Sequence, residues 1–268
     1  MRFRKLFLLS FAAIAFLVMS CSNNTPVQGD ANVQTQAVNV GDFNQVQVEG
    51  TFITVHYSQT STAPQMQVTT DKNIFDIYTF EVKRSTLVVK PKRRYKNRHI
   101  RPTQFEVTIS STALKKVSLS GAIKFEIDAP LQTDEMKIEE AGNCFINFTD
   151  NVLANVISVS MAGNSGIEGL KVNSRELNCE MAGKGIANLA GVVQKSKFDI
   201  AGSGEVNALD LRVDKLECNI AGNGNMQITV EKSLNADLMG NAHISYRGNP
   251  SEVKHNSMGS VTLTHLEN

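Results

Sequence analysis

The sequence predicts an all-β fold: a single-stranded, right-handed parallel β-helix with coils of about 20 residues, preceded by a less regular N-terminal β region. Two observations predict it. Glycines recur at a nearly fixed interval through the second half of the chain, and apolar and polar residues alternate around each glycine. The 268 residues include 41% hydrophobic residues, 18 Gly and 20% charged residues, which excludes a disordered acidic chain.

The repeat is marked by eight glycines that are 18 to 21 residues apart. They are Gly121, Gly142, Gly163, Gly183, Gly202, Gly222, Gly240 and Gly259. Apolar residues predominate two and four positions before each glycine and four positions after it, which is the period of short strands with one buried face. A unit this short cannot bury its own apolar face, so neighbouring units must stack, with glycine at each corner where the backbone turns.

A leucine-rich repeat is the nearest alternative architecture, because residues 156–167 come close to its consensus pattern. The return segments, such as residues 192–198, carry β-branched residues and no capped helical period. They favour strands over helices, and residues 115–268 are therefore predicted to form the repeats of the β-helix.

The N-terminus carries a targeting signal. Arg2, Arg4 and Lys5 precede an apolar run that is too short to span a bilayer, so residues 1–20 are predicted to be a secretory signal peptide. The letters VMSC at 18–21 resemble a bacterial lipobox, which predicts lipidation of Cys21; an ordinary cleaved signal is the alternative. Residues 21–38 are then the lipidated cysteine and a polar, flexible tether.

Residues 39–114 are less regular but also alternate, and we expect them to form the first coils and a cap that covers the end of the stack. Removal of the three basic residues of the signal leaves 24 basic residues against 26 acidic ones. Within this nearly neutral chain, residues 90–101 form a basic insert without acidic residues, which we call the basic segment. Its basic residues are Lys90, Lys92, Arg93, Arg94, Lys96, Arg98 and Arg101.

The basic segment has two interpretations. It is either a solvated loop between two strands, or a site that binds polyanions such as anionic lipid headgroups, lipopolysaccharide phosphates or acidic glycans. Nucleic acid is not expected as a partner, because only Tyr95 is available for base stacking.

No convincing enzyme site is evident in this sequence, although Glu140 as an activated acid and His243, His255 and His265 as metal ligands are alternatives to structural roles. The repeat columns align no pair of carboxylates on successive coils, and Glu140 stands alone in an apolar column. No catalytic residue, metal ligand or cofactor is therefore predicted. Cys144, Cys179 and Cys218 are expected to be buried free thiols, because the repeat register keeps them too far apart for a disulfide.

One family resemblance is carried by residues 40–57 (VGDFNQVQVEGTFITVHY), 69–76 (TTDKNIFD) and 114–122 (LKKVSLSGA), followed by the Ala-Gly repeats. Residues 39–266 resemble the family described as putative auto-transporter adhesin, head GIN domain. The resemblance implies a right-handed β-helical envelope lipoprotein or secreted protein of Gram-negative bacteria. It supplies no catalytic residues.

We therefore expect a noncatalytic envelope lipoprotein that presents a β-helical binding or adhesive surface. It would be anchored to the outer membrane through its lipid, with anionic lipid, lipopolysaccharide, glycan or an envelope protein as further partners. The alternatives are a structural or scaffolding lipoprotein that faces the periplasm, and a β-helical enzyme acting on polysaccharides. Residues 22–25 carry no acidic residue to direct the lipoprotein outward, which favours the periplasmic face.

Overall fold

The computed structural model describes residues 25–267, so the predicted signal peptide and Cys21 lie outside the described residues. The described chain is nearly all β-strand, as the sequence predicts. Its helical segments are the short helix α1 (Lys72–Phe75) and the 3-10 turn η1 (Arg93–Tyr95). Within residues 25–267, no helix is long and apolar enough to cross a membrane.

The strands follow one another with short connections. In chain order they are β1 (Val27–Gln28), β2 (Val33–Ala37), β3 (Gln45–Gln59), β4 (Gln65–Asp71), β5 (Tyr78–Lys83), β6 (Thr86–Pro91), β7 (Ile100–Arg101), β8 (Phe105–Ser111), β9 (Lys116–Ile127), β10 (Leu131–Phe148), β11 (Asn151–Arg247) and β12 (Glu252–His265).

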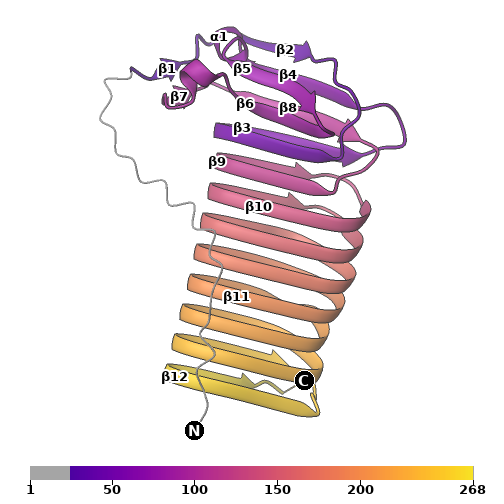
Figure 1. Ribbon diagram of the computed structural model, residues 1–268, viewed down its shortest axis with the longest axis vertical. Helices are drawn as coiled ribbons and strands as arrows, with labels where there is room; N and C mark the ends of the chain where they lie inside the picture. Colours follow the sequence, from indigo (N-terminus) through magenta and orange to yellow (C-terminus); the bar gives the residue numbers. More distant parts are fainter. Residues whose placement is uncertain (1–24, 268) are drawn as a thin grey trace.

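Figure 1 shows β3, β9, β10, β11 and β12 stacked along the long axis of the molecule. Each pass of the chain from one repeat glycine to the next is called a rung here, and β11 contains several rungs without a break. The pairs β3–β9, β9–β10, β10–β11 and β11–β12 are all parallel. Equivalent positions of neighbouring rungs therefore lie directly above one another.

The repeat glycines form one file along a single edge of this stack. Gly142 is in register with Gly121 on one side and Gly163 on the other. A methyl group added to Gly163 would lie 2.5 Å from the carbonyl oxygen of Gly142, and φ at Gly163 is +102°. The same close approach joins Gly202 to Gly183. Only glycine accommodates both the positive φ and this separation.

The interior of the stack consists of apolar columns, one side chain from each rung. The column four positions before the glycines is fully buried from β9 through β11. It contains Val117, Ile138, Val159, Cys179, Phe198, Cys218 and Ala236. The last rung differs, because β12 has exposed His255 and Ser257 where the preceding rung has buried Ala236 and Leu238.

The sheet is mixed, whereas the sequence analysis expected parallel pairing. At the end of the stack beside β3, β4 pairs antiparallel with both β2 and β8, and β5 pairs antiparallel with β6. Antiparallel neighbours can be joined by short connections. After β3, residues 60–115 leave the stack, cover its end and return to β9 (Figure 1). We call residues 25–44 and 60–115 the cap.

Part of the segment predicted to be a flexible tether is paired in this cap. β2 joins β4, and β1 pairs with β7. The buried carboxylate of Asp71 accepts hydrogen bonds from the backbone N–H groups of Ala31 (2.9 Å) and Thr103 (2.7 Å). These bonds and the two strand pairings hold residues 27–37 against the rest of the cap.

The three described cysteines are buried and form no disulfide, as expected from the repeat register. Burial raises the pKa of the Cys144 thiol to about 11, and it also raises the pKa values of Cys179 and Cys218. Thiols that are buried and protonated react slowly with electrophiles. They serve here as apolar residues of the interior columns.

Replacing Gly163 or Gly202 by Ala should destabilise the fold by about 2 kcal/mol or more, because the new methyl group meets backbone rather than a movable side chain. Urea unfolding measures the loss. Gly41→Ala is the control, since nothing lies within 4 Å of the added methyl group there and φ is not positive. Equal stability of all three variants would show that the glycine file imposes no such constraint.

Candidate functional site

The basic segment folds as the end of β6, the turn η1 and the short strand β7. Most of its basic side chains are exposed, while Lys90 and Arg98 are half-buried. The guanidinium carbon of Arg94 lies 4.7 Å from the centre of the Tyr95 ring, and that of Arg98 lies 5.9 Å from it. These cation–π contacts hold two of the positive charges around one aromatic ring.

The basic segment also holds the beginning of the described chain. The N–H groups of Val27 and Gly29 donate to the carbonyl oxygens of His99 (2.8 Å) and Arg101 (2.9 Å). The Arg98 guanidinium donates to the carbonyl oxygen of Thr25 at 3.0 Å. The chain therefore enters the cap directly beside the basic side chains.

The charge of the basic segment is not neutralised by carboxylates. In residues 25–267, no basic side chain of this segment forms an ion pair. Lys92 donates to the backbone carbonyl of Asp76 at 2.6 Å instead. The segment is thus a concentrated positive patch on the cap.

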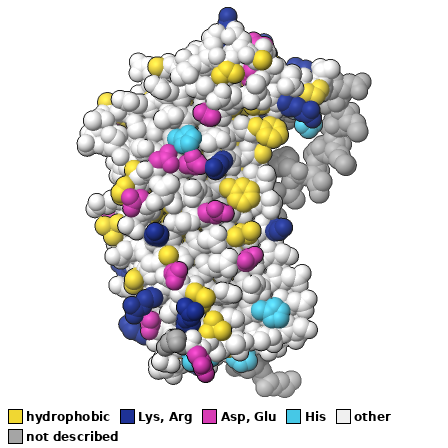
Figure 2. Space-filling view, turned by 180° about the vertical axis from the view of Figure 1, so that it is seen from behind, with side chains coloured by type: hydrophobic (Ala, Val, Ile, Leu, Met, Phe, Trp, Pro, Cys, Tyr) yellow, Lys and Arg dark blue, Asp and Glu magenta, His cyan; other side chains and the backbone are white. Residues whose placement is uncertain are grey.

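The rungs carry charge in a different way. Figure 2 shows acidic and basic side chains mixed over one face of the stack. Lys116 pairs with Glu139 at 2.8 Å, and Lys232 pairs with Asp214 at 2.7 Å, each across neighbouring rungs. The opposite charges of these pairs neutralise each other, although residues 116–265 as a whole are acidic, with 18 Asp and Glu against 13 Lys and Arg.

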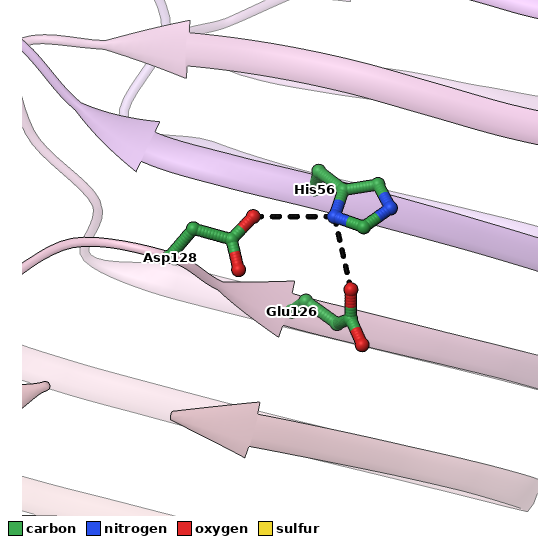
Figure 3. Close-up of side chains that lie close together, drawn as sticks. All are labelled: His56, Glu126 and Asp128. Atoms are coloured by element: carbon green, nitrogen blue, oxygen red, sulfur yellow. Dashed lines mark hydrogen bonds and ion pairs between the residues drawn. The ribbon is translucent and has the colours of Figure 1, made fainter. Parts of the chain in front are cut away.

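A second cluster joins the first two rungs: His56 on β3 with Glu126 and Asp128 at the end of β9 (Figure 3). The Nδ1 atom of His56 lies 2.9 Å from a carboxylate oxygen of Glu126 and 3.2 Å from one of Asp128. One ligand atom from each residue lies within 4.8 Å of the others, so the cluster has the composition of a metal site. The ammonium group of Lys124 already pairs with Glu126, however, and opposes a further cation there.

An open groove of 610 Å³ runs across the same rungs, and Phe52, Lys124, Phe145 and Glu168 are among the residues that line it. Phe52 is 66% exposed and has φ of +58°, a conformation that bulky side chains rarely adopt. It lies at a shift in the β3–β9 register between Thr51 and Ile53. The backbone is thus strained at a position that directs an aromatic ring toward solvent, which is typical of functional sites.

Side-chain amides continue from this groove along the rungs. Three pairs of stacked asparagines are hydrogen-bonded from one rung to another, with N···O distances of 2.7 to 3.2 Å. They are Asn143–Asn164, Asn188–Asn207 and Asn223–Asn241. A second groove, of 470 Å³, includes Asn223, Asn241 and His243 in its lining. The amides leave donors and acceptors in fixed positions along one face.

Glu140 occupies the interior column that Leu119 and Met161 occupy in the neighbouring rungs. Its side chain is 3% exposed, and within residues 25–267 neither carboxylate oxygen has a hydrogen-bond partner. Burial raises the pKa of Glu140 to about 9. A substrate cannot reach this carboxyl group, so the geometry gives it no role as a catalytic acid.

Sequence reasoning did not find His56, Glu126 and Phe52. The strands ITVHY (53–57) and IKFEI (123–127) both follow a repeat-type glycine, Gly50 or Gly121, and aligning them would have placed His56 beside Glu126. Phe52 gives no such signal, because its positive φ depends on the local register shift.

The described molecule is thus a nearly all-β protein with an amide-rich face and a basic cap. The chain belongs to the family described as putative auto-transporter adhesin, head GIN domain, whose model matches residues 42–250. The resemblance noted in the sequence is therefore confirmed. No curated protein matched the chain.

Solved structures with the same fold come from Parabacteroides and Bacteroides species. A "putative lipid binding protein" from Parabacteroides distasonis is 29% identical with a TM-score of 0.85, covering 91% of this chain and 100% of that chain. A "putative adhesin" from Parabacteroides merdae is 27% identical with a TM-score of 0.83, covering 90% and 99%. A "putative adhesin" from Bacteroides fragilis, 22% identical with a TM-score of 0.68 and covering 90% and 100%, shows the fold alone. None of these names is that of an enzyme.

Replacing Glu140 by Met, the residue of the next rung, should stabilise the protein at pH 7 by about 3 kcal/mol. The folded-state pKa is above the unfolded value, so the wild type has its full stability below about pH 4.5 and loses it as the pH rises toward about 9. The gain from Glu140→Met should therefore grow between pH 5 and pH 8 in urea unfolding experiments.

Leu119→Met, one rung earlier in the same column, is the control and should leave the pH dependence of stability unchanged. Parallel stability curves for the wild type and Glu140→Met would mean that the carboxyl group is not desolvated in the folded protein.

Proposed function

We propose that this protein is a noncatalytic, lipid-anchored envelope protein whose residues 116–265 form a right-handed parallel β-helix that presents a binding or adhesive surface. The family assignment and the adhesin names of its structural neighbours support an envelope-associated, adhesin-like head domain. Parallel pairing of rungs through the glycine file supports the β-helix. The lipobox-like letters before Cys21 support the lipid anchor.

One observation supports the proposal of a binding surface: Phe52, which is exposed and has a strained backbone, lies at the rim of the 610 Å³ groove. An exposed ring that also strains its backbone has no evident value for stability. Beside it lie the half-buried ring of Phe145 and the polar side chains of Asn143 and Asn147. Aromatic faces next to amide and carboxylate groups suit a ligand with apolar faces and many hydroxyl groups, so glycans are the proposed ligand class.

The name of one neighbour raises lipid binding as an alternative. In this chain the columns of side chains fill the space between the walls of the stack, and the two grooves lie open on its surface. Such grooves offer little enclosure for acyl chains, whereas an extended glycan can lie along them.

Phe52→Gly should separate binding from stability. Glycine relieves the positive φ, so we expect the unfolding free energy to stay the same or rise by about 1 kcal/mol. Binding to a glycan array should fall at least about tenfold, because the ring is lost. Val192→Gly, which removes another exposed apolar side chain outside the grooves, should leave array binding unchanged. Unaltered array binding by Phe52→Gly would contradict a glycan site at this groove.

Cys21→Ala should abolish incorporation of an alkyne-labelled fatty acid in a Gram-negative host, while the buried cysteines remain unlabelled. Protease treatment of intact cells then separates the two envelope roles. An adhesive head must be degraded, whereas a scaffold that faces the periplasm must be protected. Continued labelling of Cys21→Ala would refute the proposed anchor.

A further inference from the structure

We propose that the basic segment is a membrane-contact surface that lies on the anionic phospholipid headgroups of the membrane in which the protein is anchored. In this arrangement the cap faces the bilayer and β12 is the end farthest from it. The inference rests on the lipid anchor of the proposed function and adds to it an orientation and a lipid class.

The first argument is the length of the chain between the proposed anchor and the cap. Four peptide steps separate Cys21 from Thr25, and they span at most about 14 Å when fully extended. Thr25 is held by Arg98, and the next residues pair with β7. A lipid on Cys21 would therefore bring the basic segment within about one to two Debye lengths of the headgroups.

The second argument is the positive charge that the basic segment would present to the headgroups. Arg93, Arg94 and Lys96 are exposed, and within residues 25–267 their side chains form no ion pair or hydrogen bond. Residues 84–104 contain no acidic residue, and the exposed Asp76 lies beside Lys92 at the border of the basic segment. Basic residues beside a lipid anchor are attracted to anionic headgroups, and one acyl anchor combined with a basic patch binds membranes more stably than either signal alone.

The third argument is the contrast between the two ends of the stack. The glycine file from Gly50 to Gly259 contains eight intervals of about 4.8 Å, so β12 lies about 38 Å from β3. Some basic side chains on the rungs, such as Lys116 and Lys232, have carboxylate partners, and residues 116–265 contain 18 acidic residues against 13 basic ones. Attraction to an anionic surface would therefore act on the cap, and it would direct the rest of the stack away from the bilayer.

The test uses the chain from residue 21 onward with Cys21→Ser, so that no lipid contributes to binding. Co-sedimentation compares vesicles of phosphatidylcholine alone with vesicles that contain about 30 mol% phosphatidylglycerol. We expect binding only to the anionic vesicles, weakening as salt is raised from roughly 0.05 M to 0.5 M. The triple variant R93S/R94S/K96S should bind about 100-fold more weakly.

The matched control is K171S/R175S/K195S, which removes the same charge from exposed positions on the rungs that form no ion pair within residues 25–267. It should retain most of the binding. An equal loss in both triple variants, equal binding of the wild type to both vesicle types, or release by inorganic phosphate at constant ionic strength would overturn the proposal.

Amide hydrogen exchange is measured on the protein with Arg93, Arg94 and Lys96 unchanged, so this readout does not depend on the folding of the triple variants. Anionic vesicles should slow exchange at residues 92–99 and leave residues 252–265 unchanged; slowing confined to β12 would overturn the orientation. The two proposals fail separately. Absence of fatty-acid labelling in the wild type, with vesicle binding intact, rejects the anchor alone, whereas a lipidated chain with no preference for anionic vesicles rejects the membrane-contact surface alone.

Discussion

The structure depends on the close approach of successive glycines along one edge of the stack. At each repeat glycine the space of a side chain is occupied by the backbone carbonyl of the rung before, as for Gly163 beside Gly142. This approach keeps neighbouring rungs in register, so that side chains at equivalent repeat positions lie above one another inside the stack. Hydrophobic burial stabilises the interior, but the glycine file decides which residues are buried together.

The repeats of the fold could be predicted from the sequence because they are local: glycine spacing and alternation around Gly121 or Gly202 identify strands and their buried faces. The cap could not be predicted in the same way. The antiparallel pairing of β4 with β8 and the parallel pairing of β1 with β7 both depend on contacts between residues far apart in sequence. The cluster of His56 with Glu126 was hidden by the cap residues 60–115 inserted between two rungs.

The candidate sites also differ in how far the sequence predicts them. The basic segment is evident in the sequence, because seven like charges occur in a short stretch without acidic residues. The position of this segment beside the beginning of the described chain is not evident from the sequence, since the sequence does not show that Arg98 is hydrogen-bonded to Thr25. Phe52 is the opposite case: an ordinary residue in the sequence becomes notable only through its backbone conformation and exposure. A charged segment is evident from the sequence, whereas backbone strain is evident only in the three-dimensional structure.

The final strand has a consequence for assembly. A parallel stack with an uncovered end offers backbone donors and acceptors to any strand of matching spacing, which invites end-to-end polymerisation. In β12 two of the inward positions are polar, His255 and Ser257, where the rung beneath has Ala236 and Leu238, while Val253, Val261 and Leu263 keep the apolar pattern. A chain that added there would bury an imidazole and a hydroxyl without partners. These two polar positions of β12 therefore disfavour the end-to-end addition of a second molecule at this strand.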